Sequence, residues 1–276
     1  MNEKFRSFYS NIIVHQAAGG DQRLIEAFTA IPREKFLSQG GWDVLTQSGY
    51  IKTPDGNPAF IYGDYVIALD KEKSINSGQP TLHAMCLQAL DIKTGETVIH
   101  IGAGTGYYTA IIGYLVGNTG KVIAYEIESH LANLAHENLA DMPWIQVISE
   151  SAIGKCLPSP HVIYVNAGMT HPDFKWLKSL NQNGRIIFPL HPVKKRGGLL
   201  MLSPTHSEKI WKARFISQAI FIGCIGAESK AESDLLESSF INGELKDVAS
   251  LHLNNTPDET AWHVGHGWWL SKKTVK

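Results

Sequence analysis

The sequence predicts an α/β fold with a mostly parallel, seven-stranded sheet and helices on both faces. From residue 80 onward, short apolar segments alternate with longer segments whose apolar residues recur at helical spacing. One short apolar segment ends at Gly102-Ala103-Gly104-Thr105-Gly106, which we call the glycine loop, and a helical segment follows this loop directly. Strands that alternate with helices at this spacing favour a parallel sheet covered on both faces.

The N-terminal part of the chain predicts a helix and a loop that precede the sheet. Asp21 offers an N-cap to a helix over residues 22–28, where apolar residues recur at helical spacing. Pro32 ends this helix, because proline cannot continue the backbone hydrogen bonds of a helix. Residues 40–58 are rich in Gly, Pro, Asp and Asn, and this composition predicts a loop.

The following segment supplies the sheet and its helices. Pro80 suits the first turn of a helix that runs to Leu90. Further helices are expected over residues 107–116, where Gly117 ends the helix, and over residues 131–139. The expected strands are residues 97–101, 121–125, 145–148, 161–165, 184–188, 198–203 and 214–223, the last two at an antiparallel edge.

We divide the chain into three segments on this basis. Residues 1–75 form an N-terminal helical and loop region, residues 76–227 form the main α/β domain, and residues 228–276 form a C-terminal extension. Within the extension, the aromatic-rich residues 262–270 predict one strand that packs back on the domain.

The composition permits a substantial core and gives no electrostatic signal for nucleic acid or an anionic membrane. Of 276 residues 43% are hydrophobic, and 25 Lys and Arg balance 26 Asp and Glu. No apolar run is long enough to cross a bilayer, and no apolar segment follows the charged N-terminus, so we expect a cytoplasmic protein. Cys86, Cys156 and Cys224 lack metal-site spacing, and we expect no metal. The sequence leaves the oligomeric state open.

The glycine spacing distinguishes between two classes of ligand. A dinucleotide-binding loop with the G-x-G-x-x-G pattern would need glycine at position 107, where this chain has Tyr107. The G-x-G-x-G spacing suits a ligand without a pyrophosphate, such as S-adenosylmethionine, whose amino-acid end lies over the loop. The sequence therefore favours S-adenosylmethionine and disfavours a nicotinamide-dependent oxidoreductase.

The residues after the next two strands complete the predicted cofactor site. Glu126 follows the second strand, twenty residues after the glycine loop, and a carboxylate there can accept hydrogen bonds from both ribose hydroxyls. Ile127 is expected to pack on the adenine. Glu150 or Ser151, after the third strand, is expected to offer the adenine a polar contact.

Several segments together form a recognisable pattern: residues 31–36 (Ile-Pro-Arg-Glu-Lys-Phe), 77–80, 100–107, 115–117, 125–127, 165–168 and 184–189. In these segments the chain resembles the protein-L-isoaspartate O-methyltransferase family. The resemblance implies a Rossmann-like class I methyltransferase fold, S-adenosylmethionine as the methyl donor, and methyl transfer to a carboxylate of an altered aspartate in proteins.

This chain departs from the family pattern before the helix that starts at Pro80. The family segment reads Ile-Ser-x-Pro, and its serine lies at the substrate and the methyl donor. Here that position is Gly78, and the nearest hydroxyl belongs to Ser77. His161 and Glu150-Ser151-Ala152 also replace an acidic residue and a Gly-Asp-Gly segment of the family.

Methylation of a carboxylate requires alignment of the reacting atoms more than a strong base, because the nucleophile is already ionised at neutral pH. The catalytic candidates are Ser77 and Asn166, although Asn166 is equally well explained as a turn residue. The candidates for substrate binding are Asn76, Gln79, Thr170 and His171, with a helix-start role as the alternative for the histidine.

The expected function is thus S-adenosylmethionine-dependent O-methylation of a carboxylate, with an isoaspartyl protein substrate implied by the resemblance. Two alternatives remain at this stage. The acceptor could be a different small-molecule or peptide carboxylate, with the altered segment at Gly78 reshaping the pocket. Alternatively, the chain could bind S-adenosylmethionine as a module without catalytic activity.

Overall fold

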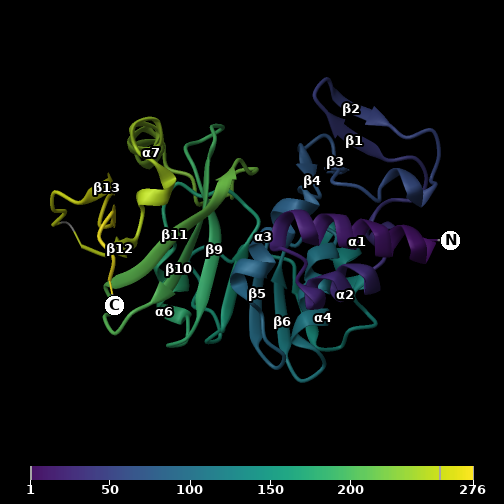
Figure 1. Ribbon diagram of the computed structural model, residues 1–276, viewed down its shortest axis with the longest axis horizontal. Coiled ribbons are helices and arrows are strands. Elements are labelled where there is room, and N and C mark those ends of the chain that lie inside the picture. The colour runs from purple at the N-terminus through teal and green to yellow at the C-terminus, as the bar shows by residue number, and fades with distance from the viewer. Residues whose placement is uncertain (1, 255, 276) are drawn as a thin grey trace. The chain divides into compact units, whose positions relative to one another are not determined.

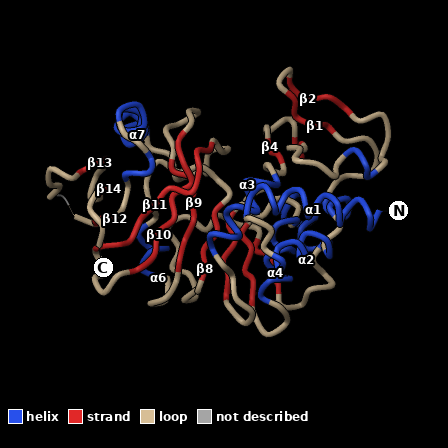
Figure 2. The backbone as a smooth tube through the Cα atoms, in the orientation of Figure 1, coloured by secondary structure: helices blue, strands red, loops and turns tan. Residues whose placement is uncertain are grey.

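In the computed structural model, which describes residues 2–254 and 256–275, the chain divides into two units (Figure 1). Unit 1 comprises residues 1–97 and 102–150, and unit 2 comprises residues 98–101 and 151–276. Helices dominate unit 1 and strands dominate unit 2 (Figure 2). The two units do not test the three segments expected along the chain, which therefore stay a prediction. No helix among the described residues is long and apolar enough to span a membrane.

The predicted helices of unit 1 begin and end close to the expected residues, whereas the helix over Asn2–Ala18 was not predicted. The Asp21 side chain accepts hydrogen bonds from two backbone N–H groups, which confirms it as an N-cap, and Pro80 occupies the first turn of its helix. The helices are α1 (Asn2–Ala18), α2 (Gln22–Ala30), α3 (Pro80–Leu90), α4 (Tyr107–Val116) and α5 (Ser129–Asn138), with short 3-10 turns at Arg33–Phe36 and Pro58–Phe60.

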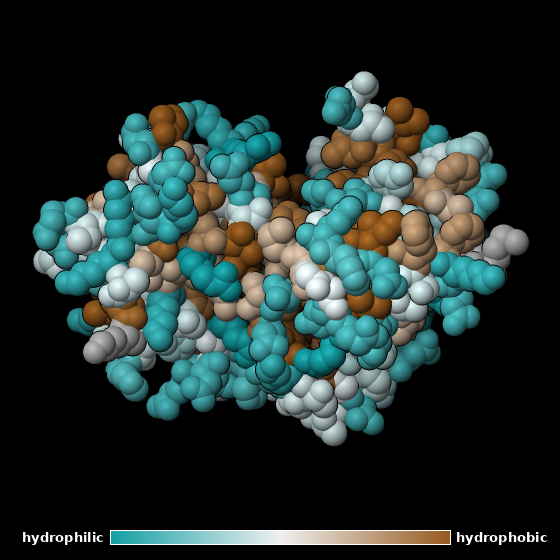
Figure 3. Space-filling model, viewed as in Figure 1, coloured by the Kyte–Doolittle hydropathy of each residue, from teal (hydrophilic) through white to brown (hydrophobic). Residues whose placement is uncertain are grey.

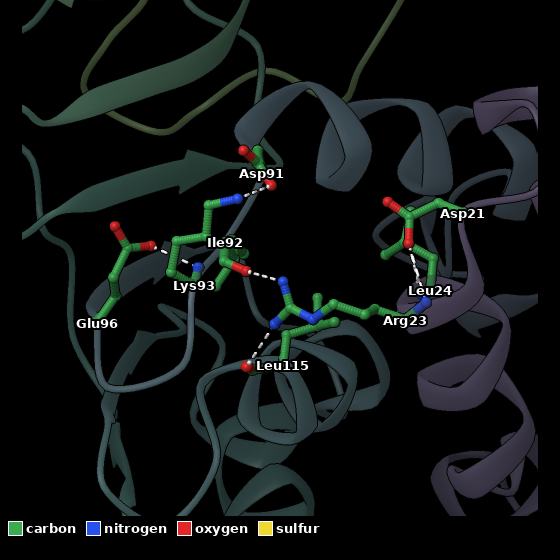
Figure 4. Close-up of polar contacts among 8 residues, drawn as sticks. All are labelled: Asp21, Arg23, Leu24, Asp91, Ile92, Lys93, Glu96 and Leu115. Carbon is green, nitrogen blue, oxygen red and sulfur yellow. Dashed lines mark hydrogen bonds and ion pairs between the residues drawn. The ribbon is translucent and has the colours of Figure 1, made fainter.

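The arginine side chain of Arg23 connects α2 with the ends of α3 and α4. The Arg23 guanidinium, on α2, donates to the carbonyl of Ile92 at 2.9 Å and to that of Leu115 at 3.1 Å (Figure 4). Ile92 follows α3, and Leu115 lies in the last turn of α4. The guanidinium therefore bonds to one carbonyl just after α3 and to one in the last turn of α4, where carbonyl groups lack the partners that the helix interior provides.

Unit 1 also contains one parallel strand pair and two hairpins. The pair is β6 (Lys121–Tyr125) with β7 (Ile145–Ile148), both within the predicted bounds. The hairpins are β1 (Asp43–Thr46) with β2 (Gly49–Lys52), and β3 (Ala68–Asp70) with β4 (Ile75–Asn76).

The prediction of a loop over residues 40–58 is wrong, because it overlooked the β1–β2 hairpin. Gly49 supplies a φ of 103° at its turn. The apolar side chains of the hairpin are not buried on one face: Ile51 is 58% exposed, and hydrophobic atoms reach the surface over the hairpin (Figure 3). The sequence therefore lacks the alternation of apolar and polar residues that marks a half-buried strand.

Unit 2 holds a sheet whose parallel part continues into a long antiparallel part. The first three strands are parallel and almost entirely buried, which explains their apolar sequences. The order along the sheet is β5–β8–β9–β10–β11–β12–β14–β13. The strands are β5 (Thr97–Ile101), β8 (Val162–Val165), β9 (Arg185–Leu190), β10 (Gly197–Pro204), β11 (Ile210–Ala219), β12 (Ser250–His252), β13 (Ala261–Val264) and β14 (Trp269–Ser271).

The α/β class is confirmed, and the antiparallel part is longer than the sequence indicates. The strand expected over residues 214–223 begins earlier, at Ile210, and ends at Ala219. The single strand expected over residues 262–270 is wrong: β13 and β14 form a hairpin, closed by a hydrogen bond from the Gly265 N–H to the Trp268 carbonyl. Unit 2 also contains helices α6 (Phe174–Ser179) and α7 (Lys230–Asn242) and a 3-10 turn at Leu245–Asp247.

Candidate active site

The glycine loop has a backbone that only glycine adopts readily. Its three glycines have φ values of 79° at Gly102, 57° at Gly104 and 97° at Gly106. A Cβ atom on Gly104 would lie 3.0 Å from Leu69 Cδ1, and one on Gly106 would lie 2.9 Å from Leu139 Cδ1. Both the left-handed conformation and the close packing therefore require glycine at these positions.

The loop is held by bonds from its own backbone. The N–H groups of Gly102 and Ala103 donate to the Tyr125 carbonyl at 2.9 and 3.1 Å, and the Gly106 N–H donates to the Ala103 carbonyl at 3.0 Å. The Thr105 hydroxyl donates to the Phe36 carbonyl at 2.6 Å. Because these three N–H groups are already used, they are not available as the array of donors that a pyrophosphate needs.

Glu126 lies directly against this loop. Its Oε2 accepts a hydrogen bond from the Gly104 N–H at 2.7 Å, and its Oε1 accepts one from the Glu128 N–H at 2.9 Å. The side chain is only 6% exposed. Burial raises the pKa of the Glu126 carboxyl, while the backbone N–H groups around it act in the opposite direction. The two oxygens therefore face a site enclosed by loop backbone.

The other predicted cofactor residues have different surroundings. Ile127 follows Glu126 and is 43% exposed, so its side chain is available to a planar ligand. Glu150 is exposed at the end of unit 1. Ser151 begins unit 2, where its hydroxyl accepts a hydrogen bond from the Ile153 N–H at 3.2 Å. Their contact with an adenine stays a prediction.

The β3–β4 hairpin covers the glycine loop within unit 1. Leu69 packs against Gly104, as the close approach of its Cδ1 atom shows. Asp70 pairs with His130 at 3.2 Å, and Lys73 forms an ion pair with Glu128. The hairpin leads directly into Asn76 and α3, so the cover of the loop and the predicted acceptor segment are one continuous stretch of chain.

The side chains of the predicted acceptor segment are already engaged. Ser77 Oγ accepts hydrogen bonds from the Ile67 N–H at 3.1 Å and from Arg33 Nη2 at 3.3 Å. Asn76 Oδ1 accepts from the Gly78 N–H at 3.0 Å, which fixes the turn before α3. The Ser77 hydroxyl thus supports the fold of the segment, and its catalytic role stays a prediction.

Two residues that organise this segment were missed by the sequence analysis. Asp64 accepts hydrogen bonds from Gln79 Nε2 at 2.6 Å and from the Thr81 N–H at 2.8 Å, so it caps α3 from a distant part of the chain. The buried Arg33 donates to the carbonyls of Ile61, Gly63 and Tyr65. Arg33 stands in the charged segment Arg33-Glu34-Lys35, which gave no sign that one of these side chains is buried, and no local pattern pointed to Asp64.

Unit 2 contributes the predicted residue Asn166, which follows β8. Its backbone N–H donates to the carbonyl of Ile101, the residue that precedes Gly102 in sequence. Its Nδ2 donates to His100 Nε2 at 2.7 Å, which places the imidazole proton on Nδ1. Asn166 Oδ1 is buried and has no hydrogen-bond partner among the described residues. Burial lowers the pKa of His100 to about 3, so this histidine is neutral.

Thr170 and His171, also in unit 2, have different surroundings. The Thr170 hydroxyl accepts from the Ser229 N–H at 2.9 Å and donates to the Ala227 carbonyl at 3.2 Å, so it joins two loops. His171 lines an open pocket of about 300 Å³ together with Phe174 and Lys175. The pocket makes His171 the more accessible of the two for a substrate, while Thr170 is buried.

His191, which packs against Gly168, is a further residue that the sequence analysis missed. A Cβ atom on Gly168 would collide with the imidazole of His191, which follows β9. His191 Nδ1 donates to the Pro192 carbonyl at 2.9 Å, and its Nε2 is buried without a partner among the described residues. The Asn166-Ala167-Gly168 turn therefore owes its glycine to the space that this ring needs.

The residues of unit 1 fit the sulfonium nucleoside that the sequence predicts. The glycine loop makes a tight turn that side chains at positions 104 and 106 would disrupt, and the Glu126 carboxylate stands beside it with no cationic partner among the described contacts. A ribose supplies two hydroxyl donors to such a carboxylate. The N–H groups of the loop that already donate to backbone carbonyls argue against a dinucleotide at the same place.

Two protein-L-isoaspartate O-methyltransferases are similar to this chain in sequence. A protein-L-isoaspartate O-methyltransferase of Thermotoga maritima is 28% identical over 179 residues, which are 63% of this chain and 52% of that relative. One from Methanococcoides burtonii is 27% identical over 181 residues, 63% of this chain and 79% of the relative. The chain thus spans about half the length of the first relative and most of the second.

Two solved structures share the fold. A protein-L-isoaspartate O-methyltransferase superposes with a TM-score of 0.66 at 23% identity, over 87% of this chain and 69% of that chain. A Plasmodium falciparum protein assigned the same activity, in complex with S-adenosyl-L-homocysteine, gives a TM-score of 0.63 at 16% identity, over 79% and 97% of the two chains. These similarities confirm the Rossmann-like methyltransferase fold.

A model of one protein family matches most of the chain. The family is described as protein-L-isoaspartate(D-aspartate) O-methyltransferase, and the match covers residues 10–228. It leaves the C-terminal extension, including α7 and the last three strands, outside the shared region. The family predicted from the sequence is confirmed, and this chain belongs to the protein-L-isoaspartate(D-aspartate) O-methyltransferase family.

Proposed function

We propose that this protein uses S-adenosylmethionine to methylate the free carboxylate of an isoaspartyl residue in a protein or peptide. Membership of the family supports the reaction, and the family name supplies the acceptor class. The observation in the structure that carries the proposal is the contact of Glu126 with the glycine loop through the Gly104 N–H. It supports a role for Glu126 as the acceptor of the ribose hydroxyls beside the loop, over which the amino-acid end of the donor is expected to lie.

On the donor side, the residues of unit 1 bind and orient. Glu126 accepts the ribose hydroxyls, and Ile127 packs on the adenine face. Leu69, on the hairpin that covers the loop, packs against Gly104 and excludes water from that side of the loop. These contacts fix the direction in which the transferable methyl group points, which is the main requirement of an in-line displacement.

Bound S-adenosylmethionine supplies a sulfonium methyl group: the acceptor carboxylate oxygen forms a bond to the methyl carbon, the carbon–sulfur bond breaks with its electron pair remaining on sulfur, and a methyl ester and S-adenosylhomocysteine result. No proton is transferred, so the protein needs no general base. Accordingly, the residues around the site offer hydrogen-bond donors and shape rather than an acid–base pair.

On the acceptor side, each unit offers its own candidates. In unit 1, Asn76 and Gln79 border the turn at Gly78, with Ser77 in a supporting position. In unit 2, Asn166 and His171 follow β8, at the carboxyl end of a parallel strand, where ligands of such sheets bind. Thr170 stabilises the loop that carries His171.

The test is methyl transfer from labelled S-adenosylmethionine to an isoaspartyl peptide, with the aspartyl peptide of the same sequence as the control. We expect turnover on the isoaspartyl peptide alone. Equal turnover on both peptides, or none on either while the donor still binds, would contradict it. Donor binding is measured separately by calorimetry, so that loss of folding is not mistaken for loss of specificity.

A second candidate is methylation of a different small-molecule or peptide carboxylate. Gly78 favours it, because the family expectation at this position is serine and the glycine alters the surface offered to the acceptor. A panel of unmodified peptides and small carboxylic acids distinguishes the two candidates. Turnover on a panel member with none on the isoaspartyl peptide would favour the second.

A further inference from the structure

The turn before α3 has no side chain at Gly78, and the imidazole of His83 occupies the space where one would lie. Gly78 has a φ of 66°, and a Cβ atom built on it would collide with His83 Nε2. His83 lies one turn into α3 and is only 3% exposed. Glycine at position 78 and histidine at position 83 therefore form one packing unit.

The Nε2 edge of the His83 ring points at Gly78, and a face of the same ring stacks on Tyr108. The ring centroids are 3.6 Å apart and the planes differ by 12°. Tyr108 is the second residue of α4, the helix that starts directly after the glycine loop. The imidazole thus connects the acceptor segment with the end of the cofactor loop, all within unit 1.

The Tyr108 hydroxyl has an unusual environment for a phenol inside a protein. The side chain is 5% exposed, and the oxygen is buried with no hydrogen-bond partner among the described residues. An unpartnered buried hydroxyl is unfavourable, and it is retained where another group completes it. Burial raises the pKa of Tyr108 well above its ordinary value, so the oxygen keeps its proton and can donate it to a hydrogen bond.

The surroundings of this hydroxyl relate it to the acceptor segment. Arg33 and Asp64 both act electrostatically on Tyr108. Arg33 donates to Ser77, and Asp64 accepts from Gln79, so the two charged residues hold the segment on both sides of Gly78. A hydrogen-bond donor among these groups suits an anionic acceptor.

We propose that Tyr108 is the residue that donates a hydrogen bond to the acceptor carboxylate, and that His83, wedged between Gly78 and the tyrosine ring, holds it in position. The inference rests on the proposed function and adds to it the residues that recognise the carboxylate. His83 is the positioning residue, because it acts through Tyr108 and through the turn at Gly78.

The first test removes one oxygen atom. Y108F keeps the ring that stacks on His83, and Y114F, a change on the exposed face of the same helix, is the matched control. We expect Y108F to raise the KM for the isoaspartyl peptide about tenfold or more, as the loss of a hydrogen bond to a charged group implies. The donor Kd should stay unchanged, and the melting temperature should not fall, because the lost hydroxyl had no partner. An unchanged acceptor KM would overturn the assignment of Tyr108.

The second test exchanges the members of the packing unit. H83A should raise the acceptor KM while the donor Kd stays unchanged, and G78S should be impaired more severely because its side chain meets the imidazole. In the double variant G78S/H83A the serine has room, and we expect acceptor kcat/KM to exceed that of G78S about tenfold. If H83A weakens donor binding as much as acceptor binding and the double variant gives no recovery, the histidine is a core residue only, and the proposal is overturned.

The outcome for the wild type separates this inference from the proposed function. Absence of isoaspartyl turnover by the wild type overturns the proposed function and this inference with it. Turnover by the wild type with identical acceptor kinetics in Y108F and H83A overturns the inference alone. Acceptor binding in the presence of S-adenosylhomocysteine, measured by calorimetry, provides the same comparison without catalysis.

Discussion

The backbone N–H of Gly104 donates a hydrogen bond to Glu126 Oε2 at 2.7 Å, across 22 residues of sequence. This bond joins the loop after β5 to the end of β6 and fixes both oxygens of the carboxylate, since Oε1 is held by the Glu128 N–H. The carboxylate is therefore oriented before any ligand arrives. Orientation in advance lowers the cost of ordering the site on binding.

Replacement of Glu126 should weaken binding of the methyl donor. In Glu126→Ala the ribose loses its acceptor and Gly104 loses its bond, so we expect the donor Kd to rise about tenfold to a hundredfold. Glu126→Gln, which keeps one acceptor oxygen, should lose less. Calorimetry with S-adenosylmethionine measures both, and Glu137→Ala, at an exposed carboxylate on α5, is the control. Unchanged donor affinity in the alanine variant would remove the ribose assignment.

Replacement of Gly106 should lower stability and weaken donor binding by more than the strain of its positive φ alone explains. Gly106 and Gly49 have similar φ values, 97° and 103°, but a Cβ atom meets Leu139 at the former and nothing within 4 Å at the latter. Gly106→Ala and Gly49→Ala therefore share the cost of a positive φ, about 1 kcal/mol. Only the former should also overpack the contact with α5 and displace the loop.

Comparison of the two variants isolates the role of the loop. We expect Gly106→Ala to lower the melting temperature more than Gly49→Ala and to weaken donor binding, which Gly49→Ala leaves intact. Thermal unfolding and calorimetry measure the two effects. Equal donor affinity in both variants would show that the loop accepts a side chain at position 106.

The cofactor half of the site was predictable because its determinants are local. Gly102, Gly104 and Gly106 need positive φ, and each is a glycine within a short window that joins a strand to a helix. The bounds of β6 and the N-cap at Asp21 followed from the same kind of nearby signal. Such patterns depend on a few adjacent residues, so one sequence suffices to detect them.

The supports of the site were not predictable because their partners are distant in sequence. Asp64 caps α3 at Thr81, and Thr105 is bonded to the Phe36 carbonyl. Nothing near Asp64 or Phe36 in the sequence marks these contacts, which exist only once the chain has folded. The β13–β14 hairpin was missed for a different reason: the aromatic residues on both sides of Gly265-His266-Gly267 were assigned to one strand, and the turn at Gly265 was not recognised.

Thr170 should contribute to stability more than to acceptor binding. Its hydroxyl accepts from the Ser229 N–H and donates to the Ala227 carbonyl, so Thr170→Val leaves the partly buried Ser229 N–H without that partner, while the Ala227 carbonyl keeps its bond from the Thr170 N–H. We expect a loss of about 1–3 kcal/mol in the free energy of unfolding, with Thr170→Ser close to the wild type. Urea unfolding measures the loss. A stable valine variant with a raised acceptor KM would instead favour direct substrate contact.

Acid should destabilise the protein through its buried neutral histidines. Burial lowers the pKa of His100 to about 3 and that of His263 to about 4, whereas an unfolded histidine titrates near pH 6.5. Below about pH 6.5 the unfolded chain binds a proton at each of these positions that the folded chain does not bind. Stability is therefore complete above this pH and falls as the pH decreases, by about 1.4 kcal/mol per pH unit for each histidine.

Substitution separates the two contributions. His100→Gln, which is neutral at every pH and can still bond to Asn166, should reduce the slope of the unfolding free energy against pH between 6.5 and 4.5 by about 1.4 kcal/mol per unit. His263→Gln should reduce it similarly in that window, and its effect should end nearer pH 4, where the folded histidine begins to bind its proton. Urea unfolding at half-unit pH steps measures these slopes. A wild-type slope in His100→Gln would mean that His100 is protonated in the folded protein, with a charge inside the sheet of unit 2 that its bond to Asn166 would have to stabilise.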